Sequence, residues 1–233
     1  MTSFTPGTLE ITPAEMTGLT VTGFGEQYDG QSHGVTVSGQ PDGSTVTYTY
    51  TNKDGEVVTT ETTPTVKDVA DGTVKVKVTV TNDNYETETR DVELKVQQRK
   101  ASITVDEDQG MTYGDATEPE LTATVSGVVT PETLNYTLSR EKGTDAGEYK
   151  IIVTLGENPN YDISTTDGKF TIARKSVSIT ADSISKASGA DDPGLTATVD
   201  GLVGEDQIEY TVLREAGEWA VTAAASTDDH IIS

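Results

Sequence analysis

The stretch LTATVSGVVTPETLNYTLSRE (Leu121–Glu141) occurs a second time, with changes, as LTATVDGLVGEDQIEYTVLRE (Leu195–Glu215). Eleven of the 21 aligned positions are identical, and the alignment needs no gap. Duplication at this length is typical of a repeated structural unit. An offset of 74 residues divides the 233-residue chain into about three units, so the repeat decides what fold to expect.

The composition is that of a β protein. Threonine accounts for 41 of the 233 residues, and hydrophobic residues for only 33%. β-Branched side chains favour extended backbone, and threonine suits a strand that is half exposed to water. The sequence has no long helical periodicity and no run near the ~20 apolar residues of a membrane span. We therefore expect an all-β chain without membrane insertion, built as three small tandem β domains, sandwich-like or open sheets, in an elongated array.

The net charge of the chain disfavours some classes of binding partner. The formal net charge is −23, and the acidic residues are scattered along the whole sequence. Such a polyanion repels nucleic-acid phosphates and anionic lipid head groups, so we expect neither as a partner. The opening MTSFTPGTLEIT (Met1–Thr12) has neither the basic start nor the apolar stretch of a signal peptide. The signal and anchor of a secreted parent protein are therefore expected outside this segment.

The small size of each unit raises a stability problem. A domain of roughly 60 to 80 residues buries only about 60% of its unfolded surface and is usually marginal alone. Disulfides are excluded because the chain has no cysteine. The remaining candidates are contacts between repeats, bound cations, or an isopeptide bond from a lysine side chain.

The second repeat, drawn from Lys100 to Ile172, shows five strand candidates separated by clusters of Gly, Pro, Asp and Asn. In the fourth candidate, alternate side chains from Tyr149 to Leu155 share one face, which predicts a packed face and a mixed one. The five candidates are Ser102–Val105, Leu121–Val125, Leu134–Ser139, Tyr149–Leu155 and Lys169–Ile172.

The first repeat is more diverged. NDNYETETRDVELKV (Asn82–Val96) aligns with NPNYDISTTDGKFTI (Asn158–Ile172) over 15 residues. Before it, GTVKVKVTV (Gly72–Val80) alternates valine with lysine or threonine, which predicts a half-exposed strand. Three copies of the unit are therefore expected.

The two ends of the chain suggest incomplete units. PGTLEITPA (Pro6–Ala14) resembles DGKFTIARK (Asp167–Lys175), the last strand of a repeat, and the third repeat has no counterpart of that strand. We expect that Gly7–Ile11 could fill the vacant edge of a neighbouring molecule's third repeat, in end-to-end strand pairing. The expected divisions are 1–18, the terminal strand of a preceding repeat plus a linker; 19–98, a diverged repeat; 99–173, a full repeat; and 174–233, a shortened repeat that lacks its last strand.

Three segments of the second repeat resemble the MBG domain of the YGX type. They are TYGDATEPELTATVSG (Thr112–Gly127), NYTLSREKGTDAGEYKI (Asn135–Ile151) and NPNYDISTTDGKFTI. Tyr113 and Gly114 occupy the position that names the type. The first repeat, with QYDGQSHGVTVSG (Gln27–Gly39), is similar to a related variant, and the third has Ser188 where the tyrosine would stand.

The resemblance covers nearly the whole chain. MBG domains occur in tandem in large bacterial cell-surface proteins, so it implies an all-β module that acts as a stalk or adhesin segment. It further implies an extracellular location on the bacterial surface, with neighbouring repeats of the parent protein as partners. It carries over no catalytic residue.

The residues themselves offer little for catalysis. The only histidines are His33, in a Gly-rich turn, and His230, four positions from the end. We expect neither to have a Ser-x-Gly elbow or a fixed acid nearby. Without cysteine there is no thiol nucleophile and no zinc–thiolate site. We therefore expect no enzymatic activity.

The sequence contains part of a calcium-binding pattern. DEDQG (Asp106–Gly110) offers Asp106, Asp108 and a glycine, as in part of a calcium-binding loop, but lacks the later bidentate glutamate. The alternative is a solvated acidic turn. We expect no other cofactor.

Tyr28 and Tyr113 are the candidates for ligand binding. Each lies beside a glycine in a predicted loop, where an exposed ring could stack on a sugar. The alternative is that these rings cap the small cores. Two functions stay open at this point: a structural stalk of β modules, and an adhesive module that binds host glycan, mucin or protein.

Overall fold

The computed structural model describes residues 6–214 and 221–225. Their regular structure consists of strands and one 3-10 turn, η1 (Val69–Asp71), which confirms the expected all-β class. The described residues include no helix with the length and apolar character needed to cross a membrane.

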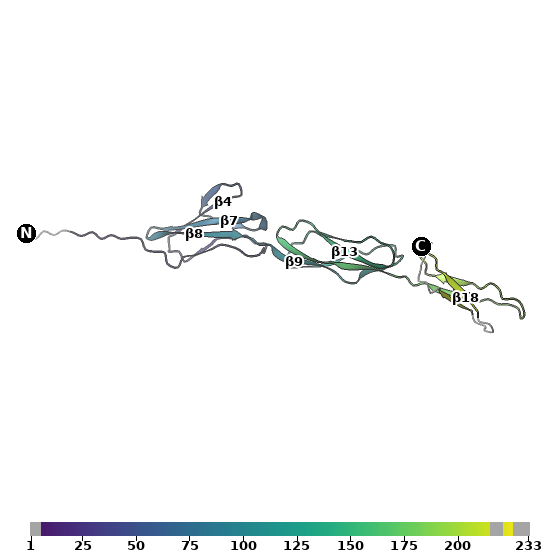
Figure 1. Cartoon of the computed structure of the whole chain (residues 1–233). Helices are drawn as coiled ribbons and strands as arrows, with labels where there is room; N and C mark the ends of the chain where they lie inside the picture. Colours follow the sequence, from purple (N-terminus) through teal and green to yellow (C-terminus); the bar gives the residue numbers. More distant parts are fainter. Residues whose placement is uncertain (1–5, 215–220, 226–233) are drawn as a thin grey trace, which may run out of the picture. The chain divides into compact units, whose positions relative to one another are not determined.

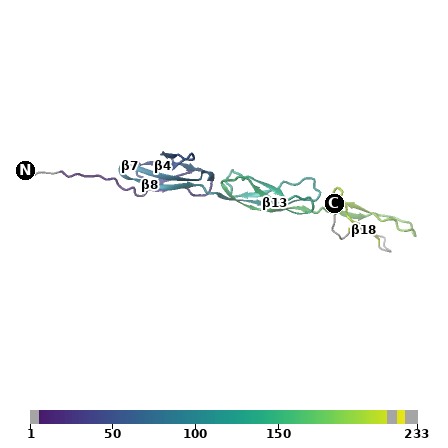
Figure 2. The same ribbon diagram turned by 45° about the horizontal axis from the view of Figure 1, so that its top comes forward.

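The first repeat is organised around an antiparallel sheet of four strands in the order β5-β4-β7-β8. Figures 1 and 2 label three of these strands, β4, β7 and β8. Two smaller pairings, β1 with β3 and β2 with β6, complete the repeat. Its strands are β1 (Thr20–Thr22), β2 (His33–Gly34), β3 (Thr36–Ser38), β4 (Thr45–Thr51), β5 (Val57–Thr60), β6 (Thr65–Val66), β7 (Thr73–Asn82) and β8 (Tyr85–Lys95).

The central strand of that sheet, β7, follows the pattern predicted from the sequence. Val76, Val78 and Val80 are at most 1% exposed, whereas Lys75 and Lys77 between them face the solvent. Alternation with a period of two places one side chain in the core and the next in water. The prediction of a half-exposed strand is therefore confirmed.

The second repeat has a sheet of four strands, β10-β15-β13-β12, and a sheet of three, β11-β9-β14. The parallel pairing of β9 with β14 joins the start of the repeat to its later half. Its strands are β9 (Arg99–Val105), β10 (Gln109–Thr112), β11 (Ala123–Ser126), β12 (Tyr136–Arg140), β13 (Gly147–Leu155), β14 (Tyr161–Thr166) and β15 (Gly168–Ala173).

Each of the five predicted segments of the second repeat contains a strand, and two further strands were not predicted. β10 has the sequence QGMT, which shows no apolar alternation, and β14 has YDISTT, in which only Tyr161 and Ile163 alternate with polar residues. Both are fixed instead by parallel backbone pairing with β15 and β9. Pairing with a distant strand leaves little trace in local sequence.

The third repeat is built from two-stranded pairs, β16 with β17 and β18 with β19. No residue of this repeat belongs to the buried core of the described chain. The expected absence of its last strand concerns residues beyond 225, outside the described part. Its strands are β16 (Ser178–Ala181), β17 (Ala197–Asp200), β18 (Tyr210–Leu213) and β19 (Thr222–Ala225).

The chain forms two compact units, and their boundary runs through the second repeat. The first unit joins the first repeat to residues 123–137 and 153–166 of the second. The second unit joins residues 105–122 and 138–152 to the chain from residue 167 onward. One end of the second repeat therefore packs with the repeat before it, and the other end with the repeat after it.

The core of the first unit is continuous across the repeat boundary. One cluster of buried residues contains Tyr28 and Leu94 from the first repeat together with Ile103, Leu134 and Tyr161 from the second. Of the three sources of stability considered for such small domains, the structure shows contact between repeats.

The N-terminal segment does not form the strand expected for Gly7–Ile11. Residues 6–13 are in no strand, and Leu9 and Ile11 are 90% and 89% exposed. A strand needs a neighbouring edge to bond with, and no described residue pairs with this segment. Pairing with another molecule stays a prediction.

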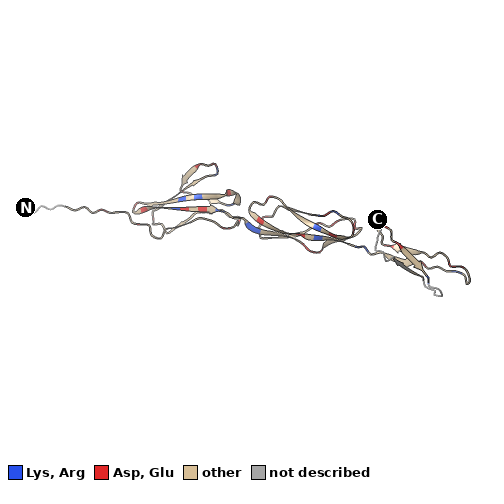
Figure 3. Ribbon diagram, viewed as in Figure 1, with Lys and Arg blue, Asp and Glu red and all other residues tan. Residues whose placement is uncertain are grey.

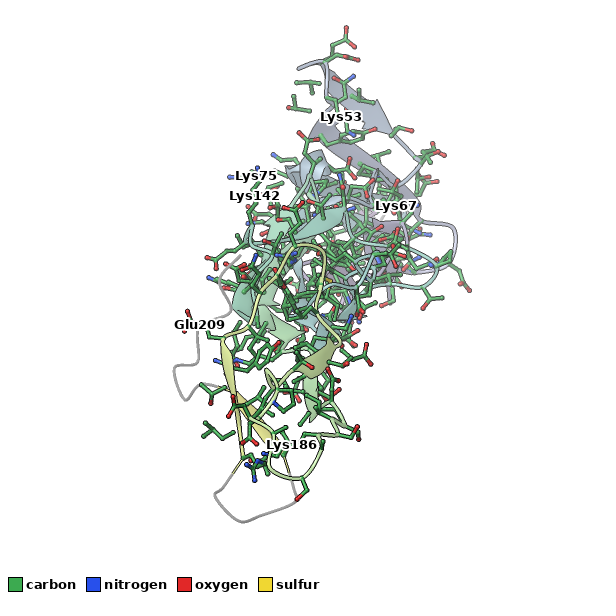
Figure 4. All side chains as sticks on the ribbon, turned by 90° about the vertical axis from the view of Figure 1, so that its right-hand side faces the viewer. Lys53, Lys67, Lys75, Lys142, Lys186 and Glu209 are labelled. Atoms are coloured by element: carbon green, nitrogen blue, oxygen red, sulfur yellow. The ribbon has the colours of Figure 1, made fainter. Side chains whose placement is uncertain are left out.

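The charged residues lie on the surface. Figure 3 shows Lys and Arg interspersed with Asp and Glu along the strands, and in Figure 4 the labelled side chains, such as Lys53 and Lys186, lie at the outside of the ribbon. No described polar or charged residue is buried. Exposed ion pairs such as Lys150–Asp167, at 2.6 Å, contribute about 0–1 kcal/mol each.

Candidate functional site

Tyr28 is held at the end of the first repeat and points into the core. Its backbone N–H donates to the carbonyl of Gln97, just beyond β8, at 2.8 Å. The residue is 3% exposed, and its ring meets that of Tyr161 edge-on, with centroids 5.7 Å apart. The expectation of an exposed, sugar-stacking Tyr28 is therefore wrong, because the ring fills the core shared with the second repeat. The alternative, a ring that caps the core, agrees with this position.

The hydroxyl of Tyr28 reaches a carboxylate of the next repeat. Tyr28 donates to one oxygen of Glu132, and Tyr161 donates to the other. The hydroxyl of Tyr161 also accepts from the backbone N–H of Val129 at 3.1 Å. One carboxylate thus joins two phenols, one from each repeat.

The electrostatics of this group favour an ionised carboxylate between neutral phenols. The hydrogen bonds from Tyr161 and then Tyr28 lower the pKa of Glu132 from its ordinary value. The same contact, together with burial, raises the pKa of Tyr28 to about 12. Two charge-assisted hydrogen bonds, the stronger kind, are therefore present at neutral pH.

A second set of polar contacts flanks the tyrosines. The side-chain amide of Asn160 donates to Asp68 at 2.8 Å, and its oxygen accepts from the backbone N–H of Val69 at 2.9 Å. Arg99 donates to the carbonyl of Tyr28 at 3.4 Å. We refer to Tyr28, Asp68 and Val69 of the first repeat and Glu132, Asn160 and Tyr161 of the second as the first junction.

Tyr113 takes part in a similar contact with the third repeat. Its backbone N–H donates to the carbonyl of Ala173, the last residue of β15, at 2.8 Å. Its hydroxyl donates to Asp206 at 3.3 Å, and this hydrogen bond is the main cause that raises the pKa of Tyr113. The ring is half-buried. We refer to Tyr113, Gly114, Val203 and Asp206, all in the second unit, as the second junction.

Asp106 and Asp108 lie in a tight turn. The backbone N–H of Asp106 donates to the carbonyl of Thr122 at 3.1 Å, and Asp108 has a positive φ of 58°. Among the described residues, no group of three or more His, Cys, Asp or Glu side chains lies close enough to hold a metal ion. The structure therefore brings no third ligand to the two aspartates, and the calcium site stays a prediction.

His33 has a local structural environment. Its ring stacks on Phe24 with centroids 3.7 Å apart, and its Nε2 lies 2.9 Å from an oxygen of Asp29. The expectation that no acid would lie near His33 is therefore wrong, because Asp29 is four residues earlier in the chain. It lies in β2 rather than in a simple turn. His230 lies outside the described residues.

The described surface includes at least two hollows. One, of about 290 Å³, lies beside Glu132 and Tyr161, where both polar groups are already engaged with each other. The other, of about 400 Å³, is lined by the backbone and side chains of residues 208–211. Neither includes a histidine.

Sequence reasoning missed Glu132, Asn160 and Asp206. A signal for two of them exists in the repeat alignment, where Glu132 and Asp206 occupy the same place in the two copies of the duplicated stretch. The chain has 39 Asp and Glu residues, so an acidic residue at the same position of two repeats does not stand out.

Comparison with known proteins gives a family but no close relative. No curated protein matches the sequence. Among solved structures, the fibronectin(III)-like modules of CbhA from Clostridium thermocellum are similar with 12% sequence identity and a TM-score of 0.25. That match covers 67% of this chain and 94% of the other.

Family models account for nearly all of the chain. The MBG domain of the YGX type matches residues 101–171 and 177–229, and a further MBG domain matches residues 17–98. This confirms the resemblance expected from the sequence. MBG domains are repeat domains of surface proteins and are typically non-catalytic. The chain therefore belongs to the MBG domain family, as a tandem array of its repeats.

Proposed function

We propose that this chain is a non-catalytic spacer in a bacterial cell-surface protein, in which docked β repeats hold another part of the protein away from the cell. In this proposal the segment is extracellular, and its immediate partners are the neighbouring repeats of the parent protein.

The observation that carries the proposal is the first junction. Tyr28 and Tyr161 bind the same carboxylate of Glu132 from two different repeats, and the buried core runs across the boundary. Repeats that share a core and a polar network lose the hinge freedom of independently tethered domains. Restricted hinges are what a spacer requires.

The adhesive alternative has less support. An adhesin that used tyrosine platforms would present Tyr28 and Tyr113 to solvent. Tyr28 is instead buried, and Tyr113 is half-buried with its hydroxyl on Asp206. Host glycan, mucin or protein would then have to bind elsewhere on the repeats.

The test is small-angle X-ray scattering on the purified chain. A compact globule of 233 residues would have a radius of gyration of roughly 17 Å. We expect a folded particle with a clearly larger radius and an asymmetric distance distribution. A radius near the compact value would overturn the spacer proposal.

A binding panel of immobilised mucins and glycans, with and without calcium, addresses the alternative in parallel. The spacer proposal expects no saturable binding from the folded chain. Saturable, salt-resistant binding would favour the adhesive function, and a requirement for calcium, lost in Asp106→Asn/Asp108→Asn, would link it to that turn. The matched variant Asp54→Asn changes an exposed aspartate in another turn.

A further inference from the structure

The two junctions use equivalent positions of the repeat. Tyr28 and Tyr113 each donate a backbone N–H to the residue that ends their repeat, Gln97 or Ala173. In the alignment of Asn82–Val96 with Asn158–Ile172, these two acceptors directly follow the last aligned pair. Each tyrosine is therefore fixed at the end of its repeat that faces the next one.

The acceptors in the following repeats are equivalent as well. Glu132 and Asp206 occupy the same position of the duplicated stretch, five residues after Gly127 and Gly201. Each accepts a hydrogen bond from the tyrosine of the preceding repeat. The same pair of positions is thus joined twice in one chain.

A glycine two residues after Tyr28, and one directly after Tyr113, make a matching apolar contact. A Cβ added to Gly30 would lie 3.1 Å from Val129, and one added to Gly114 would lie 2.4 Å from Val203. Val129 and Val203 are again equivalent positions. Both glycines have positive φ, 77° and 85°, so the backbone turns there and brings the next repeat close.

Other copies of the repeat differ at these positions. The third repeat has Ser188 in place of the tyrosine, and among the described residues no atom beyond the chain neighbours lies within 4 Å of a Cβ added to Gly189. Aligned with the second repeat, the first has Ser44 in place of Glu132 and Pro41 in place of Val129. Neither serine can reproduce the contact of a phenol with a carboxylate.

We propose that the tyrosine and the glycine that follows it, Tyr28 with Gly30 in the first repeat and Tyr113 with Gly114 in the second, form a directional docking element whose partner is the acid and valine of the following repeat. The tyrosine hydroxyl binds the acid while the glycine admits the valine. This inference rests on the proposed function as a spacer, and it assigns the residues that hold consecutive repeats together.

The test measures each junction separately in the full chain by pulsed electron paramagnetic resonance. The chain has no cysteine, so introduced cysteines are the only labelling sites. Asp54→Cys with Thr165→Cys spans the first junction, and Lys142→Cys with Ser183→Cys spans the second. All four positions are exposed.

Tyr28→Phe and Tyr113→Phe keep the ring and remove only the hydroxyl. Loss of one net hydrogen bond implies about a fivefold rise in the undocked population at that junction. We expect Tyr28→Phe to broaden only the first distance distribution and Tyr113→Phe only the second. Tyr85→Phe, at the start of β8 and so at the end of that strand opposite to Gln97, should change neither.

A pair of glycine variants tests the apolar half of the contact. Gly114→Ala and Gly189→Ala impose the same kind of backbone strain, since φ is 85° and 76°, but only the first places a Cβ against Val203. We expect Gly114→Ala alone to broaden the second distribution. Equal broadening by both would show that strain, rather than docking, is responsible, and would overturn this part.

Other outcomes are equally decisive. If the tyrosine variants leave both distributions unchanged, or broaden both alike, the docking assignment is wrong. An extended scattering profile combined with unchanged distributions would reject the docking residues and leave the spacer function standing. A compact profile would reject the spacer function itself.

Discussion

The two junctions place a tyrosine and an acid at equivalent positions, yet they differ in how deeply the tyrosine is buried and how closely it approaches the acid. At the first, Tyr28 is 3% exposed and shares the carboxylate of Glu132 with a second phenol. At the second, Tyr113 is half-buried and reaches Asp206 at 3.3 Å, beyond the usual length of an O–H···O bond.

The sequence accounts for the difference. Aspartate is one methylene shorter than glutamate, so Asp206 extends less far toward its tyrosine than Glu132 does. The third repeat also has His230 and Ile231 where the second has Asn160 and Tyr161, so its aligned sequence supplies neither the second phenol nor the flanking amide. The same docking position can therefore give contacts of different strength, which depend on the length of the acidic side chain and on the residues beside it.

The largest expected effect comes from removing the buried ring. Tyr28→Ala deletes an aromatic side chain from the shared core, which typically costs about 3–5 kcal/mol in the free energy of unfolding. Tyr113→Ala should cost far less, because that ring is half-buried. Urea unfolding of the full chain, followed by circular dichroism, measures both. Equal losses would contradict the contrast drawn between the junctions.

Removing the shared carboxylate should have an intermediate effect. Glu132→Ala leaves two phenol hydroxyls, on Tyr28 and Tyr161, without their acceptor. Because the glutamate is itself exposed to water, which can replace it in part, we expect a loss of about 1 kcal/mol. Asp206→Ala, which frees only Tyr113, should lower stability less. Thermal unfolding of the two variants in parallel gives the ranking, and the reverse order would refute it.

The flanking amide offers a comparison with a matched control. Asn160→Ala removes the hydrogen bonds to Asp68 and Val69, which cross the first junction, and should cost about 1 kcal/mol. Asn84 aligns with Asn160 in the first repeat, but no described contact of its side chain crosses a junction. Hydrogen exchange should show faster opening around residues 68–71 in Asn160→Ala and not in Asn84→Ala. The same exchange in both would exclude a specific role for Asn160.

The sequence predicts the repeat strands well where a strand has its own pattern. β7 alternates valine with lysine or threonine, and β13 alternates apolar and mixed positions, so the buried face of each strand can be predicted from its sequence. β10 has no such pattern and β14 has only a short one; backbone pairing with β15 and β9 holds these two strands in place. Strands that are held by pairing with a strand far away in the sequence are difficult to predict from local sequence.

The candidate site was only half predictable, for a related reason. Tyr28 and Tyr113 stand out because each lies within two residues of a glycine in a loop, and both do lie at junctions. The direction in which each ring points could not be predicted from the sequence of one repeat. The ring of Tyr28 packs against Tyr161 of the next repeat, and Tyr113 contacts Asp206 of the repeat that follows it. Exposure depends here on the neighbouring repeat, which the pattern within one repeat does not describe.

The smallest expected effect concerns acid. The pKa of Glu132 is lowered in the folded chain, so the ionised carboxylate stabilises the fold at pH values above its ordinary pKa of 4.5. This contribution should decline as the pH falls below 4.5 and through the lower folded value. Other carboxylates with lowered pKa, such as Asp71 and Asp192 at about 2, also lose stability in acid.

The difference between the wild-type chain and Glu132→Ala isolates the contribution of Glu132, because the other carboxylates are present in both. We expect this difference in unfolding free energy to be constant near neutral pH and to shrink in acid. Urea unfolding at a series of pH values from neutral to below 4.5 measures it. A difference that stays constant into acid would show that Glu132 holds the junction without its charge, as a neutral partner of the two phenols. Its replacement by glutamine would then preserve the junction, and the distinction from Asp206 would reduce to side-chain length.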